Sequence, residues 1–257
     1  MKSAKRKNFL STTILLVLCL LLISAVERAY AGRGEIRVAV ATNFIRTMDE
    51  FAHGFEKESG IRVKRSSSAT GMLYSQIING APYDLFLAAD AKRPELLHRQ
   101  GVCDKPFAYA DGRVVLWSSR KDLDEAQNWL QVLVRDDIQR IALANPATAP
   151  YGEAAMQALA KAGLIEQVDK RLVYGQNVGQ AFQYGQQGAA DLAFVSRSFA
   201  LSEQGQKGKT WPLPEAPPVV QKACLLKNSK NKDSVRDLIA YLQTEQAKTI
   251  LSEFGYE

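Results

Sequence analysis

The sequence predicts an α/β fold of two lobes, each a sheet flanked by helices, with a ligand cleft between them. Segments rich in β-branched and apolar residues alternate with segments of helical spacing over residues 35–100. This alternation is typical of a parallel, doubly wound sheet covered by helices. This alternation of strand and helix segments is interrupted near residues 111–119, and a second alternating unit follows over residues 140–198. Ligands of such folds bind at the carboxyl ends of the strands.

Residues 1–31 have the order of a secretory signal. Basic MKSAKRKNF precedes the uncharged, mostly apolar LSTTILLVLCLLLISAV, and Ala29 and Ala31 occupy the A-x-A positions before a cleavage site. The alternative is an uncleaved anchor, although the apolar stretch is shorter than the ~20 residues of a membrane span. Leu18 precedes Cys19, where a lipoprotein signal requires a small residue. We therefore predict an exported protein whose mature chain begins at residue 32.

Charge and cysteine content limit the classes of function that remain possible. The chain has a net charge of +6, from 33 Lys and Arg and 27 Asp and Glu. Five of these bases and one acid lie in residues 1–31, so the mature chain has a net charge of +2 and loses the compositional support for nucleic-acid binding. Cys103 and Cys224 remain in the mature chain. An exported compartment permits a disulfide, but two free buried thiols are an equal alternative.

The first lobe is predicted to begin with three strands, each followed by a helix. The first helix is amphipathic, because Phe44, Met48, Phe51 and Phe55 recur at spacings of four, three and four, and Gly60 ends it. The expected strands are 35–42, 61–66 and 83–90, and the expected helices are 44–60, 71–80 and 92–100.

The second lobe is predicted from four further strands, and the chain then returns to the first lobe. The strands are 113–119, 140–146, 171–175 and 191–198, with helices that start near Gly152 and Val178. A proline-rich segment becomes strand-like over 211–227, and one helix over 234–255 packs back on the first lobe. Residues 32–112 and 222–257 are thus assigned to lobe 1, and residues 113–221 to lobe 2.

Four of the predicted strands lead into turns that offer neutral hydrogen-bond donors. These turns are Thr42-Asn43, the serine-rich SSSATG of 66–71, Tyr151-Gly152 and Asn177-Val178-Gly179. A helix N-terminus carries unpaired N–H groups and a partial positive charge, so it holds anions readily. No acidic residue lies at the four turn tips, and none of these turns requires a Lys or Arg to hold an anion. Four such turns that face one cleft predict a site for a small tetrahedral oxyanion.

These segments resemble the periplasmic molybdate-binding proteins of ABC transporters, which are type II periplasmic binding proteins. The resemblance covers essentially the whole mature chain, and RSSSATGMLYSQIINGAPYDLFLAAD is its most specific stretch. LANPATAPYGEAAMQAL and NVGQAF continue it. The resemblance implies the two-lobed type II fold and a protein that captures molybdate or tungstate and delivers it to a membrane permease.

The resemblance also implies the site residues. The family binds the oxygens of the anion through hydroxyl and main-chain N–H groups, so no side chain binds the metal directly and no cofactor is expected. Many members place a tyrosine at the end of the strand DLAFVS, where this chain has the shorter Ser196. Tyr151, where other members have a small residue, is expected to compensate from the opposite side. The resemblance implies that the oxyanion is contacted by Thr42, Asn43, Thr70, Tyr151 and Val178, with Ser68 and Ser196 as additional candidates.

Other functions remain open at this stage. One is binding of another solute, such as sulfate or an organic anion; another is a sensor with the same fold and no transport role. An enzyme is not expected, because His53 and His98 lie within predicted helices away from the turns. SSRK and SKNK match S-x-x-K without its partner motifs, and there is neither a metal-type Cys/His spacing nor a P-loop. We expect a monomer that closes on its ligand by a hinge.

Overall fold

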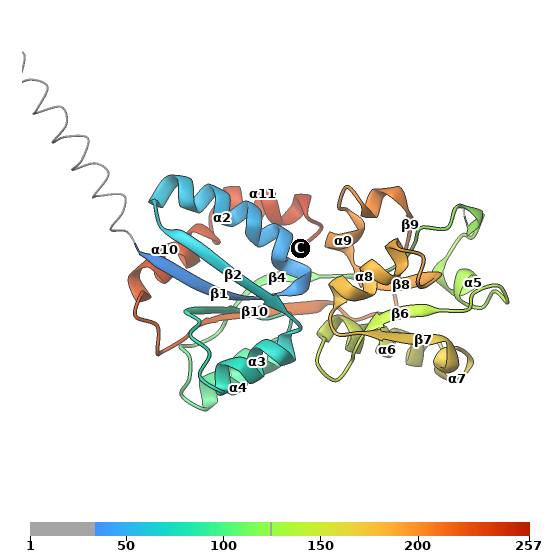
Figure 1. Cartoon of the computed structure of the whole chain (residues 1–257), viewed down its shortest axis with the longest axis horizontal. Coiled ribbons are helices and arrows are strands. Elements are labelled where there is room, and N and C mark those ends of the chain that lie inside the picture. Colours follow the sequence, from blue (N-terminus) through green and yellow to red (C-terminus); the bar gives the residue numbers. More distant parts are fainter. Residues whose placement is uncertain (1–33, 124) are drawn as a thin grey trace, which may run out of the picture.

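The protein has two α/β lobes that lie side by side, as seen in a computed structural model that describes residues 34–123 and 125–257 (Figure 1). The first sheet has the strand order β2-β1-β3-β10-β4, and the second has the order β7-β6-β8-β5-β9. The predicted signal, residues 1–31, lies outside the described residues. In the ranges that the structure describes, no helix is long and apolar enough to cross a membrane.

The sheet of lobe 1 is covered by helices on both faces. Alternate residues of a strand point to opposite faces, so Val38 packs with helices on one face and Ala39 on the other. Helix α2 ends at Gly60, which adopts a left-handed φ of 71° that favours glycine. The strands are β1 (Glu35–Ala41), β2 (Arg62–Ser68), β3 (Leu85–Leu87), β4 (Phe107–Gly112) and β10 (Val219–Leu225). The helices on one face are α2 (Ile45–Ser59), α10 (Lys232–Tyr241) and α11 (Glu245–Glu253), and those on the other are α3 (Thr70–Ile78) and α4 (Lys92–Arg99).

Lobe 2 repeats this layered arrangement. Leu116 and Leu143 face helices α5 to α7, whereas Trp117 and Ala142 face α8 and α9. The strands are β5 (Val114–Ser118), β6 (Ile141–Ala144), β7 (Leu172–Gly175), β8 (Leu192–Ser196) and β9 (Lys209–Pro212). The helices are α5 (Trp129–Leu133), α6 (Pro150–Lys161), α7 (Ile165–Val168), α8 (Val178–Gln186) and α9 (Arg197–Ala200), with 3₁₀ turns η1 (Thr42–Phe44), η2 (Lys121–Leu123), η3 (Asp169–Arg171) and η4 (Gly205–Lys207).

The chain crosses between the lobes twice. It passes from β4 to β5 through Arg113, and it returns between β9 and β10. Strand β10 begins at Val219, which pairs with Gly112 of β4, so this strand joins the first sheet ahead of the expected boundary between residues 221 and 222. Both crossings lie at the centre of the molecule (Figure 1).

Several elements differ from the sequence prediction. The single helix expected over 234–255 is two helices, because the Thr244 side chain accepts a hydrogen bond from the Ala247 main-chain N–H and starts α11 anew. Strands β4 and β9 and helices α5 and α7 were not predicted. Cys103 and Cys224, whose state was left open, are both free and buried.

Candidate functional site

Helix starts from both lobes meet at one small cavity between the lobes. Its volume is about 10 Å³, close to the least that a single water molecule needs. Lobe 1 contributes the carboxyl end of β1 and the start of α3, and lobe 2 contributes the starts of α6 and α8. The cavity brings together five of the seven candidate residues, namely Thr42, Asn43, Thr70, Tyr151 and Val178.

Three of the helical segments that begin at the cavity, namely η1, α3 and α6, have no side-chain cap. Their N-cap residues are Ala41, Ala69 and Ala149, and an alanine side chain accepts no hydrogen bond. The first N–H groups of a helix have no partner within the helix. In α8 the Asn177 side chain accepts only from the Gln180 N–H, at 3.0 Å. The arrangement therefore presents main-chain donors to the cavity.

Thr70 adds a hydroxyl whose orientation is fixed by the fold. Its side chain is only 1 % exposed, and its Oγ1 accepts a hydrogen bond of 3.0 Å from the Ala89 main-chain N–H. Because the oxygen already accepts on that side, the hydroxyl proton is available to donate elsewhere. Thr42 Oγ1 similarly accepts from Ser67 Oγ at 3.3 Å. Both threonines are thus arranged as donors.

Tyr151 and Asn43 belong to a buried polar network beside the cavity. Asn43 Nδ2 donates to Gln221 Oε1 at 2.8 Å and to the Tyr256 hydroxyl at 3.1 Å, and it lies 3.4 Å from the Tyr151 hydroxyl. The Asn43 side chain is therefore occupied, which leaves its main-chain N–H for a ligand. Burial raises the pKa of Tyr151 well above its ordinary value and the pKa of Tyr256 to about 12, so both phenols stay protonated.

The remaining two candidates, Ser68 and Ser196, do not line the cavity. Ser68 is the half-buried last residue of β2. Ser196 is fully buried, but its Oγ lies 2.8 Å from Ser198 Oγ and accepts from the Phe199 main-chain N–H. The hydroxyl of Ser196 is thus used to begin helix α9, and it is not directed at the cavity.

The network also contains residues that the sequence interpretation missed, namely Gln221, Tyr109, Tyr256 and Ser198. Gln221 accepts from the Tyr109 hydroxyl at 3.0 Å, and the Tyr256 hydroxyl donates to the Asn43 main-chain oxygen at 2.7 Å. Gln221 had a recognisable signal: it alternates with Val219 and Ala223 at the inward-facing positions of β10, where a polar side chain is unusual. The other three have no such signal.

The cavity wall is electrically neutral. None of the described residues that line it carries a charge at neutral pH, because Tyr151, its one phenol, stays protonated. Asp90, at the end of the third strand region, accepts from the Arg93 main-chain N–H and pairs with its guanidinium, so its charge is matched outside the cavity. His53 and His98 lie at exposed positions of α2 and α4. Across residues 34–123 and 125–257, no group of three or more His, Cys, Asp and Glu is placed to hold a metal ion.

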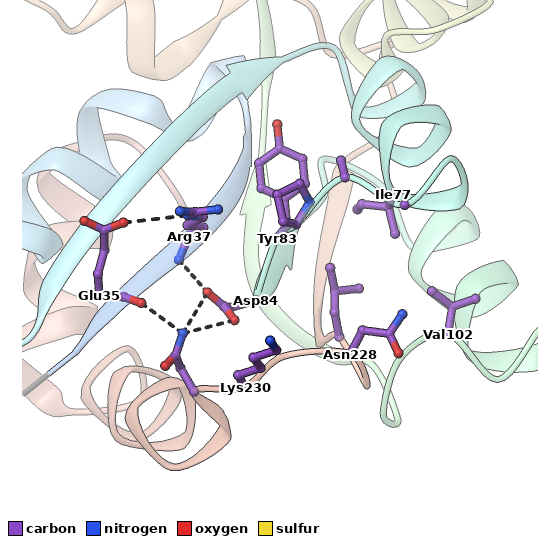
Figure 2. A pocket seen from close by; sticks show the side chains of 13 residues that line it. Glu35, Arg37, Ile77, Tyr83, Asp84, Val102, Asn228 and Lys230 are labelled. Carbon is purple, nitrogen blue, oxygen red and sulfur yellow. Dashed lines mark hydrogen bonds and ion pairs between the residues drawn. The ribbon is translucent and has the colours of Figure 1, made fainter.

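A larger hollow of about 510 Å³ lies at the opposite end of the lobe 1 sheet (Figure 2). The Asp84 carboxylate beside it accepts from the Arg37 main-chain N–H at 2.8 Å and from Ser229 Oγ at 2.5 Å. In the same region, Asn231 Nδ2 donates a hydrogen bond of 3.0 Å to the Glu35 main-chain oxygen. These groups hold the amino ends of β1 and β3 in place. The hollow is therefore a weaker candidate than the cavity at the carboxyl ends, where ligands of such folds bind.

Comparison with known proteins agrees with the two-lobed architecture. The family model of bacterial extracellular solute-binding proteins matches residues 36–257. The chain belongs to this family. It is 40 % identical over 235 residues to the molybdate-binding protein ModA of Azotobacter vinelandii, covering 88 % of this chain and 91 % of the relative. It is 33 % identical over 230 residues to ModA of Rhodobacter capsulatus, covering 88 % and 89 %.

A solved structure extends this likeness to three dimensions. The periplasmic molybdate-binding protein of Azotobacter vinelandii superposes with a TM-score of 0.82 at 36 % sequence identity. The match covers 86 % of this chain and 98 % of the solved one. The predicted two-lobed fold of a periplasmic binding protein is confirmed by this match.

Proposed function

We propose that this solute-binding protein captures molybdate, and tungstate with it, in the periplasm and delivers it to the permease of an ABC transporter. The observation that carries the proposal is the small cavity between the lobes, whose polar groups are neutral donors. The 40 % identity to a molybdate-binding protein supports the choice of ligand. We assign the contacts to the hydroxyls of Thr42, Thr70 and Tyr151 and to main-chain N–H groups at Asn43 and Val178.

The chemistry of the donors favours a fully ionised tetrahedral dianion. Such an anion only accepts hydrogen bonds, and a hydrogen bond to a charged group contributes about 1.5–3 kcal/mol. Hydrogen phosphate carries a proton that needs an acceptor. The described residues that line the cavity include no carboxylate to accept it. An unmatched buried hydroxyl would then cost about 1–3 kcal/mol.

The size of the cavity favours an inorganic ligand. Sites for organic solutes have volumes of about 300–1,000 Å³. The cavity of about 10 Å³ is far smaller. A tetrahedral oxyanion is larger than one water molecule, so the lobes must part slightly to hold it, whereas an organic anion would require them to stand well apart. A compact oxyanion can be surrounded by both lobes at once, so that burial strengthens each donor contact.

Capture proceeds by closure of the two lobes. The open protein binds the anion on one lobe, and the other lobe rotates about the two crossings, at Arg113 and between β9 and β10. The closed form then presents surfaces of both lobes to the permease. Export through a cleaved signal in residues 1–31 would place the protein in the periplasm. We infer a monomer with a binding role and no catalytic one.

Calorimetric titration of residues 32–257 with molybdate, tungstate, sulfate and phosphate tests the proposal. We expect tight one-to-one binding of molybdate and tungstate, with no heat from phosphate. Preferential binding of sulfate, the second candidate ligand, would assign the protein to another oxyanion. A folded protein that binds none of the four would contradict the oxyanion function itself.

A further inference from the structure

Gln221 is a fully buried polar residue on the strand that returns to lobe 1. It lies in β10 at a bulge, where the pairing register with β4 shifts between Gln221 and Lys222. Its Oε1 accepts hydrogen bonds from Asn43 Nδ2 at 2.8 Å and from the Tyr109 hydroxyl at 3.0 Å. Two donors at one oxygen fix the orientation of the amide, so that Nε2 points the other way.

The Gln221 Nε2 group is buried beside the Tyr151 hydroxyl. Within the described ranges, Nε2 has no hydrogen-bond partner. A Cβ atom placed on Gly112 would lie 2.0 Å from the Tyr151 hydroxyl oxygen and 2.9 Å from Gln221 Nε2, so both atoms border the same point. A buried donor without an acceptor is costly, and the phenol oxygen is the acceptor at hand.

We propose that Gln221 is a positioning residue for the ligand: when the oxyanion is bound, its Nε2, which has no partner in this structure, donates to the Tyr151 hydroxyl oxygen and thereby directs the Tyr151 proton at the oxyanion. The inference rests on the proposed function. Asn43 Nδ2 approaches the same oxygen from the network, at 3.4 Å. Tyr151 accepts from the network at its hydroxyl oxygen, and among the described residues no hydrogen bond takes the proton of that hydroxyl. Tyr151 lines the cavity, so in this proposed arrangement its proton is directed at the anion and no lone pair opposes the anion.

The absence of a side chain at position 112 is part of this arrangement. Gly112 ends β4, next to the first crossing, and the Tyr151 hydroxyl occupies the space that a Cβ would fill. Tyr151 belongs to α6 of lobe 2, whereas Gln221 and Gly112 belong to the sheet of lobe 1. The contact thus links the ligand-binding hydroxyl to the strands about which the lobes rotate.

A double-mutant cycle in the mature protein tests the inference, with calorimetric titration of molybdate as the measurement. We expect Tyr151→Phe to weaken binding about 10- to 100-fold, the loss of one hydrogen bond to a charged group. Gln221→Leu should weaken binding about 10-fold when Tyr151 is present, and less than about 2-fold when it is added to Tyr151→Phe. That non-additivity is the signature of a residue that acts through Tyr151.

The controls separate positioning from general damage. Gln76 Oε1 accepts from the Tyr83 hydroxyl at 2.9 Å on an exposed surface of lobe 1, so Gln76→Leu breaks a similar Gln–Tyr contact away from the cavity and should leave affinity unchanged. If Gln221→Leu does not fold, Gln221→Met provides an unbranched chain of similar length. If Gln221→Leu lowers the affinity equally in proteins with and without the Tyr151 hydroxyl, this inference is overturned, while the proposed function stands. Failure of the unaltered protein to bind molybdate would overturn the proposed function, and this inference with it.

Discussion

The main-chain N–H of Gly71 donates a hydrogen bond of 2.9 Å to the main-chain oxygen of Thr148 across the cleft. Gly71 belongs to the first turn of α3 in lobe 1, and Thr148 lies just before α6 in lobe 2. On the same rim, Arg93 Nη2 donates to the Ala147 main-chain oxygen at 3.2 Å. The lobes are therefore closed in this structure, and main-chain contacts hold the rim of the cavity.

Gly71→Ala should weaken ligand binding without weakening the fold. An added Cβ would lie 3.0 Å from the Thr148 Cα and main-chain oxygen, which is tighter than normal contact, so the closed lobes would have to part slightly. Alanine is also a better helix former than glycine, by up to about 1 kcal/mol in a helix interior, so the substitution should not weaken α3 in the open protein. We expect an affinity loss of about 10-fold, from about 1–2 kcal/mol of overpacking, in calorimetric titration.

The control for this substitution is Met72→Ala, on the neighbouring position of α3, which is 46 % exposed. It should leave affinity unchanged. In thermal unfolding without ligand, the unfolding temperature of Gly71→Ala should equal or exceed that of the unaltered protein. If Gly71→Ala binds as tightly as the unaltered protein, the rim contact does not limit closure.

Thr70→Ala and Thr70→Ser form a matched pair that tests the hydroxyl at the start of α3. Alanine removes the donor to the ligand and also leaves the buried Ala89 N–H without its acceptor. We expect Thr70→Ala to lose affinity about 10-fold or more and to be less stable by about 1–3 kcal/mol. Serine retains the hydroxyl, so Thr70→Ser should stay within about 3-fold of the unaltered affinity. Equal affinities for all three proteins would remove Thr70 from the site.

The turn residues could be predicted from sequence because their placement is local. Thr42, Thr70 and Val178 each follow a strand and begin a helix, and the carboxyl ends of parallel strands meet at one edge of a sheet. The network could not be predicted in this way. Asn43 contacts Gln221 and Tyr256, which are 178 and 213 residues away along the chain. Such contacts depend on how the two lobes and the C-terminal segment assemble.

Local patterns also explain the errors in the predicted elements. In β4 the sequence FAYADG has no run of β-branched residues, so its pairing with β10 stabilises a strand that propensity alone does not indicate. Apolar residues recur on both sides of Thr244, which hid the break between α10 and α11. Ser196 was an additional candidate for contact with the oxyanion. Its side chain is short, and its hydroxyl accepts from the Phe199 main-chain N–H at the start of α9.

Asp137→Asn should destabilise lobe 2 in a pH-dependent way. Hydrogen bonds and charge from Arg135 and Arg120 hold the pKa of Asp137 well below its ordinary value of 3.8. A carboxyl group with a depressed pKa stabilises the fold above its ordinary pKa, and this contribution is lost as the pH falls toward the folded-state pKa. The variant should therefore be less stable than the unaltered protein at pH 7, and the difference should shrink as the pH falls below about 4.

Urea unfolding of both proteins at pH 7 and pH 3 measures this difference. Asp233→Asn is the matched control, because it removes a single ion pair, with Arg236, on the exposed surface of α10. Exposed single pairs contribute little to stability. A difference between Asp137→Asn and the unaltered protein that stays constant with pH would assign the effect to packing or hydrogen bonding instead of charge.

Cys103 and Cys224 should be unreactive thiols in the native protein. Cys103 and Cys224 are both fully buried, and the neighbouring Cys103 thiol and burial raise the pKa of the Cys224 thiol. Since the thiolate is the reactive form, both effects suppress reaction. Titration with an aromatic disulfide reagent at pH 8 should detect no thiol in the folded protein and two after unfolding in guanidinium. Rapid reaction of the native protein would contradict their burial. No reaction even after unfolding would instead mean that the two residues are joined in a disulfide, which the export of this chain would permit.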